Sequence, residues 1–395
     1  MTVHTGREFL AIPGPTNVPD EVLSAMHRPA IDIYMPELEA ITKSCMDDLR
    51  GIFKTAGRTY IYAANGHGAW EAALTNVLSR GDHILVLESG YFAMGWGEMA
   101  AVMAIEAEIL PGDWRRAVDP AALEQRLKED TDGIIKAVLV VQIDTAAGVV
   151  NDIAALRQAM DNAGHGALLM VDAIASLGTM PFEMDAWGID VTVTGSQKGL
   201  MMTPGLSFVA AQGKALAAHK EADLRTHYWD WTAREGEEHY NKYCGTAPEH
   251  MLFGLRKAFD MLLAEGLEVT FLRHRLLADA VRRAVSVWAE GGALDFNITA
   301  VDQRSNSVTT ILMGEGHDPA TLLKFCHEKC GVVLGIGIGA LGGKSFRIAH
   351  MGYVNAPMIL GTLGVIETAL QALEIPHGKG GVQAAIDSLA QSITN

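Results

Sequence analysis

A lysine and an aspartate each follow a predicted buried strand, and together they could hold one ligand. Asp172 ends the apolar run 168–171, and Lys198 comes just after the run 191–194, behind a glycine and a hydroxyl. In α/β sheets, ligands bind outside the carboxyl ends of the strands, so an acid and an amine at two such ends can lie across one ligand. Taken singly, an aspartate after a strand more often belongs to a turn or helix cap, and a lysine there is more often solvated.

A small-residue turn upstream could bind an anion. Residues 64–71 read as a strand end, a turn containing Gly66, His67 and Gly68, and a helix start. Free backbone N–H groups at a helix start attract phosphate, and glycines let it approach the chain. Pyridoxal phosphate needs these parts: a phosphate cradle, an acid at the pyridine nitrogen (Asp172) and a lysine at the aldehyde (Lys198). The sequence therefore predicts this cofactor.

Strand-length apolar runs alternate with helical patterns through the larger N-terminal part of the chain. The predicted strands are 60–63, 83–87, 105–110, 137–143, 167–171, 191–194 and 206–211, and the helices between and after them are 69–78, 120–128, 153–163 and 248–264. This alternation predicts an α/β domain with a mostly parallel seven-stranded sheet between helices.

The pattern changes after a long predicted helix at 271–290. Strands at 307–312, 331–334 and 345–349 and helices at 319–328 and 356–373 indicate a smaller α+β unit. No Pro/Ser-rich linker or repeat separates the two parts. We expect an N-terminal segment at 1–18, a large domain at 19–280 and a small C-terminal domain at 281–395.

Composition narrows the possible partners and location. At 395 residues, with 49% hydrophobic and 20% charged residues, the chain can fold as two domains without disulfides. Its net charge of −16 repels nucleic acid and anionic membrane surfaces. Four scattered cysteines suit a reducing compartment, and no apolar run reaches the ~20 residues of a membrane span, so we expect a cytoplasmic protein. Cys326 and Cys330, with His327 between them, fall short of a zinc site, so no metal is predicted.

A late glycine motif offers a different function. Residues 337–342 match G-x-G-x-x-G after an apolar run, as a dinucleotide site does. No convincing helix follows, and no acid lies about 20 residues further on. An NAD-dependent dehydrogenase is therefore kept as an alternative only.

Four motifs in order resemble one known family over residues 12–373. They are Pro13–Pro19, Val171–Ser176, Gly195–Gly199 and Phe346–Gly352. Together they resemble class V aminotransferases of fold type I, in the alanine–glyoxylate and serine–glyoxylate branch. The resemblance implies a fold-type I pyridoxal phosphate transferase, and a homodimer with its active site at the subunit interface.

The resemblance also implies a role for individual residues. Lys198 and Asp172 match the catalytic pair, and Phe92 matches the aromatic residue that stacks on the cofactor ring. Asp144 stands where the family usually has Glu. The cofactor contacts implied are Gly66, His67, Gly68, Phe92, Thr145, Asp172, Ile174, Ser196, Gln197 and Lys198, with Tyr243 and Thr246 from the neighbouring subunit, and the substrate contacts are Gly14, Asn17 and Arg347.

The expected reaction is a ping-pong transamination from a small L-amino acid, alanine or serine, to glyoxylate. Arg347 alone suffices for one carboxylate, and a dicarboxylic donor would want a second cation, for which His67, Arg304 and His350 are candidates. Tyr34 follows Ile33 where serine–glyoxylate members carry His-Arg, so aspartate or pyridoxamine remains an alternative donor. A cysteine desulfurase-like lyase and a non-catalytic cofactor-binding protein are further alternatives.

Overall fold

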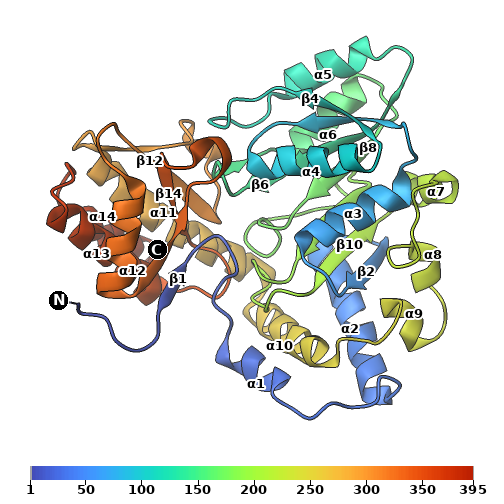
Figure 1. Ribbon diagram of the computed structural model, residues 1–395, viewed down its shortest axis with the longest axis horizontal. Helices are drawn as coiled ribbons and strands as arrows, with labels where there is room; N and C mark the ends of the chain where they lie inside the picture. The colour runs from blue at the N-terminus through green and yellow to red at the C-terminus, as the bar shows by residue number, and fades with distance from the viewer. Residues whose placement is uncertain (1, 395) are drawn as a thin grey trace.

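The computed structural model describes residues 2–394 and shows two sheets, each covered by helices (Figure 1). The larger is seven-stranded, in the order β2-β10-β9-β8-β5-β3-β4. Its strands are β2 (Arg58–Tyr62), β3 (His83–Leu87), β4 (Glu106–Leu110), β5 (Ile135–Val141), β8 (Leu168–Asp172), β9 (Val191–Gly195) and β10 (Ser207–Ala211). Strand β10 runs opposite to the other six strands, so the predicted mostly parallel sheet is confirmed.

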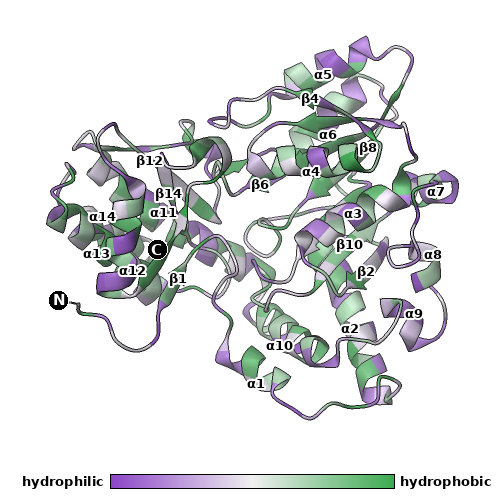
Figure 2. Cartoon of the chain, in the orientation of Figure 1, coloured by the Kyte–Doolittle hydropathy of each residue, from purple (hydrophilic) through white to green (hydrophobic). Residues whose placement is uncertain are grey.

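Both faces of the inner strands of this sheet are buried, which explains their continuous apolar runs, whereas the edge strand β4 is partly exposed. Leu85, Val138 and Leu169 join one hydrophobic core, and their chain neighbours Ile84 and Leu139 join another on the opposite face. Figure 2 shows the strands as mainly hydrophobic, whereas the outer helices also carry hydrophilic residues. The helices of this part of the chain are α1 (Asp20–Met26), α2 (Pro36–Phe53), α3 (Gly66–Val77), α4 (Tyr91–Val102), α5 (Pro120–Glu129), α6 (Ile153–Asn162), α7 (Gly213–Glu221), α8 (Trp231–Arg234), α9 (His239–Tyr243) and α10 (Glu249–Glu265).

The smaller sheet has five strands in the order β1-β13-β14-β12-β11. They are β1 (Phe9–Ala11), β11 (Leu294–Phe296), β12 (Val308–Met313), β13 (Val332–Ile336) and β14 (Ser345–Ala349). Around them lie α11 (Leu267–Ala289), α12 (Pro319–Cys330), α13 (Ala356–Ala372), α14 (Gly381–Thr394) and the 3-10 turns η1 (Val301–Gln303) and η2 (Gly339–Leu341). A two-stranded ribbon, β6 (Ile143–Asp144) and β7 (Val149–Val150), follows β5.

Two features tie the two sheets together. Strand β1 pairs in parallel with β13, so the N-terminal segment joins the five-stranded sheet before the chain enters the seven-stranded one. The predicted boundary at residue 280 falls inside α11, one continuous helix. The two parts are therefore joined by a rigid element and by a strand that the sequence pattern did not predict.

The glycine motif and the two closely spaced cysteines, on which two alternative functions depend, both lie in the part of the chain that forms the smaller sheet and its helices. The glycine motif at 337–342 lies between β13 and β14, an antiparallel pair, whereas a dinucleotide fingerprint joins a strand to a helix in a parallel unit. Cys326 and Cys330 lie on α12, and burial raises the pKa of Cys326 to about 12.

None of the helices described between residues 2 and 394 is long and apolar enough to cross a membrane. The same residues contain no cluster of three or more side chains suited to a metal.

Candidate active site

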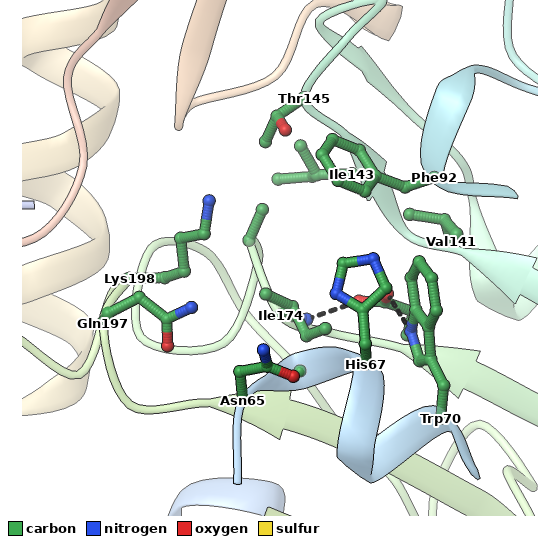
Figure 3. A pocket seen from close by; sticks show the side chains of 13 residues that line it. Asn65, His67, Trp70, Phe92, Val141, Ile143, Thr145, Ile174, Gln197 and Lys198 are labelled. Atoms are coloured by element: carbon green, nitrogen blue, oxygen red, sulfur yellow. Dashed lines mark hydrogen bonds between the residues drawn. The ribbon is translucent and has the colours of Figure 1, made fainter. Parts of the chain in front are cut away.

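A cavity of about 270 Å³ lies at the carboxyl ends of the central strands (Figure 3). It is lined by Asn65, Gly66, His67, Trp70, Phe92, Val141, Ile143, Thr145, Asp172, Ile174, Ala175, Gln197 and Lys198. These residues come from the start of α3, the start of α4 and the segments that follow β5, β8 and β9. The topology thus brings together most of the predicted cofactor contacts.

Asp172 ends β8 and is buried, with 3% of its surface exposed. Its Oδ2 accepts a hydrogen bond from Trp70 Nε1 at 2.7 Å, and its Oδ1 accepts one from the Ile174 backbone N–H at 2.7 Å. Burial raises the pKa of Asp172 to about 7, and the two donors and Lys198 oppose this rise. A positively charged ring nitrogen next to Asp172 would offset the cost of burying the carboxylate charge. Asp172 in this environment can therefore bind such a nitrogen strongly.

Lys198 follows β9, and its amine reaches the N-terminal segment. The Nζ donates a hydrogen bond to the Pro13 carbonyl oxygen. Burial, together with the nearby Arg347, lowers the pKa of Lys198 to about 8, so a fair fraction of the amine is neutral near that pH. Gly14 packs against the lysine, since a Cβ at this position would lie 2.4 Å from Nζ. Residues 13 and 14 therefore restrict where the amine can lie.

The first turn of α3 forms one end of the cavity. The Asn65 side chain accepts a hydrogen bond from Gly68 N at 3.2 Å and so caps the helix. Other N–H groups of a first turn have no acceptor within the helix and can bind an anion. Gly66 gives this turn room, because a Cβ there would lie 2.5 Å from the Ile174 side chain. Gln197 also lines the cavity, and its Oε1 is buried without a hydrogen-bond partner.

Phe92 and Thr145 form the opposite wall, and Asp144 positions both. The Asp144 carboxylate accepts hydrogen bonds from Phe92 N at 2.9 Å, Ala93 N at 3.1 Å and Ala146 N at 3.0 Å. It therefore caps the start of α4 while it shapes the turn that carries Thr145. Full burial raises the pKa of Asp144 to about 6.

Arg347 comes from β14 of the small sheet and is 7% exposed. Its Nε donates to Ile336 O at 2.7 Å and its Nη1 donates to Thr145 O at 3.0 Å. Burial lowers its pKa to about 10, which still leaves the guanidinium charged at neutral pH. The structure thus places a cation of the small domain against the Thr145 wall, close enough to Lys198 to affect its charge.

Other predicted contacts lie outside the cavity lining. Ser196 Oγ donates to Thr203 O at 2.6 Å. Asn17 donates from its amide to Leu10 O at 2.9 Å and lines a separate cavity. Gly68 packs against Ala64 and Trp229.

The two residues expected to reach a neighbouring subunit also lie away from this cavity. Tyr243 is 3% exposed, and its hydroxyl lies 2.8 Å from Thr42 Oγ1. Thr246 is exposed. Their predicted role across an interface stays a prediction.

Sequence reasoning missed Trp70, a lining residue that bonds directly to Asp172. A signal was present, because Trp70 follows Gly66 by four residues and so lies on the same face of the helix start. The apolar lining residues Val141, Ile143 and Ala175 carried no comparable signal.

Comparison with known proteins identifies the family. The class-V aminotransferase family matches residues 9–342. The chain is 36% identical to a serine–glyoxylate aminotransferase of Methylorubrum extorquens, over 97% of this chain and 96% of the relative. It is 35% identical to an L-aspartate–glyoxylate aminotransferase of Paracoccus denitrificans, over 98% of each chain. A solved ureidoglycine–glyoxylate aminotransferase from Bacillus subtilis superposes with a TM-score of 0.89 at 25% identity, covering 98% of this chain and 99% of that one. The chain therefore belongs to the class-V aminotransferases.

Proposed function

We propose that this aminotransferase moves the amino group of a small L-amino acid, alanine or serine, to glyoxylate with the help of pyridoxal phosphate. The observation that carries the proposal is the placement of Lys198 and Asp172 in one cavity at the ends of adjacent strands. Relatives named for glyoxylate transamination match over nearly the whole chain and support the acceptor.

The residues present suit pyridoxal phosphate. The first turn of α3, where Gly66 leaves room beside Ile174, suits its phosphate end, Asp172 its ring nitrogen, and Lys198 its aldehyde. The Phe92 side chain lines the cavity where a flat ring can pack against it. The cavity is near the lower end of the roughly 300–1,000 Å³ typical of ligand pockets, as suits a small aromatic cofactor.

The chain's own groups can then carry out proton transfer. When bound, pyridoxal phosphate supplies a ring that withdraws the electron pair left when the amino acid loses its Cα proton. Asp172 holds the ring nitrogen protonated, which keeps that withdrawal strong. Lys198, whose pKa is lowered to about 8, would accept the Cα proton as a base and then, as an acid, donate it to the C4′ carbon of the cofactor. The buried setting of Lys198 limits competing proton exchange with water.

The cations around the site favour a donor with one carboxylate. Arg304 lies in another cleft, with its Nε bonded to Ile298 O. His350 is fully buried between Asn306 O and Thr309, and burial lowers its pKa to about 3. His67 lines the cavity, but burial lowers its pKa as well, so it is mainly neutral at pH 7. Arg347 remains the permanent cation for the substrate, which supports alanine or serine over aspartate.

A spectrum tests the cofactor and the donor together. The purified protein, loaded with pyridoxal phosphate, is mixed separately with alanine, serine and aspartate in the absence of glyoxylate. We expect alanine or serine to bleach the visible absorption band, and added glyoxylate to restore it. Bleaching by aspartate alone would overturn the donor assignment, and failure to bind pyridoxal phosphate would overturn the function.

We also propose a cytoplasmic homodimer in which Tyr243 and Thr246 serve the neighbouring site. The free state of all four cysteines supports the reducing location. Mixing Lys198→Ala with Thr246→Val subunits tests the dimer, because one site of each mixed dimer keeps both residues intact. Activity above the average of the two separate variants is expected after mixing, because the mixed dimers contain intact sites. Activity equal to the average of the two would contradict a shared site.

A further inference from the structure

We infer that Trp70 is a positioning residue for the reaction, holding Asp172 in its ionised, cofactor-binding form. This inference rests on the proposed function, because it assigns a role within the pyridoxal phosphate site. The Trp70 Nε1–H donates to Asp172 Oδ2 at 2.7 Å, and both side chains are buried. In Figure 3 a dashed line marks this hydrogen bond at the Trp70 indole, next to the His67 side chain.

The bond acts on the charge of Asp172 because an indole can only donate. A donor stabilises an ionised carboxylate and gives nothing to the proton-bearing oxygen of an acid. The second donor, Ile174 N–H, is bound to Oδ1, so each carboxylate oxygen has one fixed partner. This fixes the plane of the carboxylate as well as favouring its charge.

The indole itself is held in place by other rings. Trp96 stacks on it with centroids 5.8 Å apart, and the His67 ring lies at 4.5 Å. Phe92, across the cavity wall, meets it edge-on at 6.5 Å. Trp70 therefore links Asp172 to the aromatic wall of the cavity and to the first turn of α3. This contact fixes the distances between the acid, the aromatic wall and the helix start.

The other titratable groups near Asp172 must be separated from this effect. Asp144 raises its pKa and Lys198 lowers it, and His67 lines the same cavity. These groups are the same in wild type and in a Trp70→Phe variant. A difference between the two proteins in the pH dependence of cofactor binding thus reports the lost N–H.

The chain offers a matched control in Trp96. It is fully buried in the same core cluster and stacks on Trp70, yet its Nε1 has no hydrogen-bond partner. Trp96→Phe therefore removes comparable ring volume and an unpaired N–H, and leaves the bond to Asp172 in place.

Equilibrium dialysis of the full-length, cofactor-free protein against pyridoxal phosphate from pH 5.5 to 9 tests the inference. A hydrogen bond to a charged acceptor changes an ionisation equilibrium about tenfold. In Trp70→Phe, affinity should therefore fall off at a pH about one unit higher than in wild type, and should approach wild type at high pH. Trp96→Phe should keep the wild-type midpoint.

The outcomes of this experiment distinguish a positioning role of Trp70 from a merely structural one. A parallel loss of affinity at every pH in Trp70→Phe would show a merely structural role and overturn the inference, as would equal midpoints in the two variants. Combining Trp70→Phe with Asp172→Asn gives a second check, since the pH shift must vanish when the acid is absent. If wild type does not bind pyridoxal phosphate, the proposed function fails. If wild type binds and Trp70→Phe keeps its midpoint, only this inference fails.

Discussion

Replacing Gly14 by alanine should separate the stability of this protein from its activity. Gly14 has φ +113°, a backbone conformation that side chains rarely adopt. A Cβ added there would lie 2.4 Å from Lys198 Nζ and 2.6 Å from its Cε. The clashing atoms form the end of a flexible side chain, so the lysine can move aside. The fold is then kept, but the amine leaves the position that the cofactor needs.

The substitution has two separate effects, backbone strain at residue 14 and displacement of the Lys198 side chain. A backbone conformation with a large positive φ costs a non-glycine residue about 1–3 kcal/mol. Displacing Lys198 costs little in stability, because the side chain swings into the cavity. Its effect on the reaction is larger, since misplacing a reacting group by about 1 Å can lower the rate on the order of a hundredfold.

Gly266→Ala provides the matched control for backbone strain. Gly266 has φ +87°, and nothing lies within 4 Å of a Cβ added at this position. It sits between α10 and α11, so the strain cannot be released by fraying of a terminus. Thermal unfolding should show similar losses in both variants, whereas single-turnover amino transfer should slow about a hundredfold in Gly14→Ala only. Equal rates in the two variants would refute the claim that Gly14 positions the lysine.

Three further changes test the charges of the site. Arg347→Lys should raise the KM for the amino donor about tenfold or more while kcat falls less, because a lysine cannot form a two-pronged carboxylate contact; steady-state kinetics would show it, and an unchanged KM would exclude Arg347 as the carboxylate ligand. The single-turnover rate should rise with pH through about 8 as Lys198 loses its proton, and a flat profile would argue against its role as base. Asp172 has its pKa raised from 3.8 to about 7, so its stabilising contribution is present below pH 3.8 and is lost as pH rises through about 7. Cofactor-free Asp172→Asn should therefore be more stable than wild type at pH 8, by up to about 4 kcal/mol at about 1.36 kcal/mol per pH unit, with the gain vanishing near pH 4 in denaturant titrations.

The sheet and the catalytic pair could be predicted because their signals are local. The inner strands of the large sheet, such as β8 and β9, are buried on both faces and are therefore largely apolar, and each of the seven predicted runs overlaps an observed strand, including the edge strand β4 with its exposed Glu106. Asp172 and Lys198 lie at strand ends, where topology alone brings them together. The order of the motifs then indicated the family.

Contacts between distant segments left no comparable signal. Strand β1 is only Phe9–Ala11, and its partner β13 is more than 300 residues away. Asn17, which the family resemblance implied as a substrate contact, donates its amide to Leu10 O, a bond that no sequence pattern indicated, and its substrate role stays a prediction. Tyr243 pairs with Thr42 through two hydroxyls on different helices, which no spacing reveals. Such contacts depend on packing, which the sequence encodes only through the whole fold.

Asp144 can reach the start of α4 because the chain before that helix comes very close to it. The carboxylate binds the first backbone N–H groups of α4, and Gly90 stands where a Cβ would lie 2.2 Å from the Asp144 Cγ. An acid one methylene shorter than glutamate can reach those N–H groups only if the chain before α4 comes this close, and glycine permits that approach. The position of Phe92 is therefore set jointly by the acid and the glycine. Because Asp144 also raises the pKa of Asp172, the same residue connects the aromatic wall of the cavity with the charge of its acid.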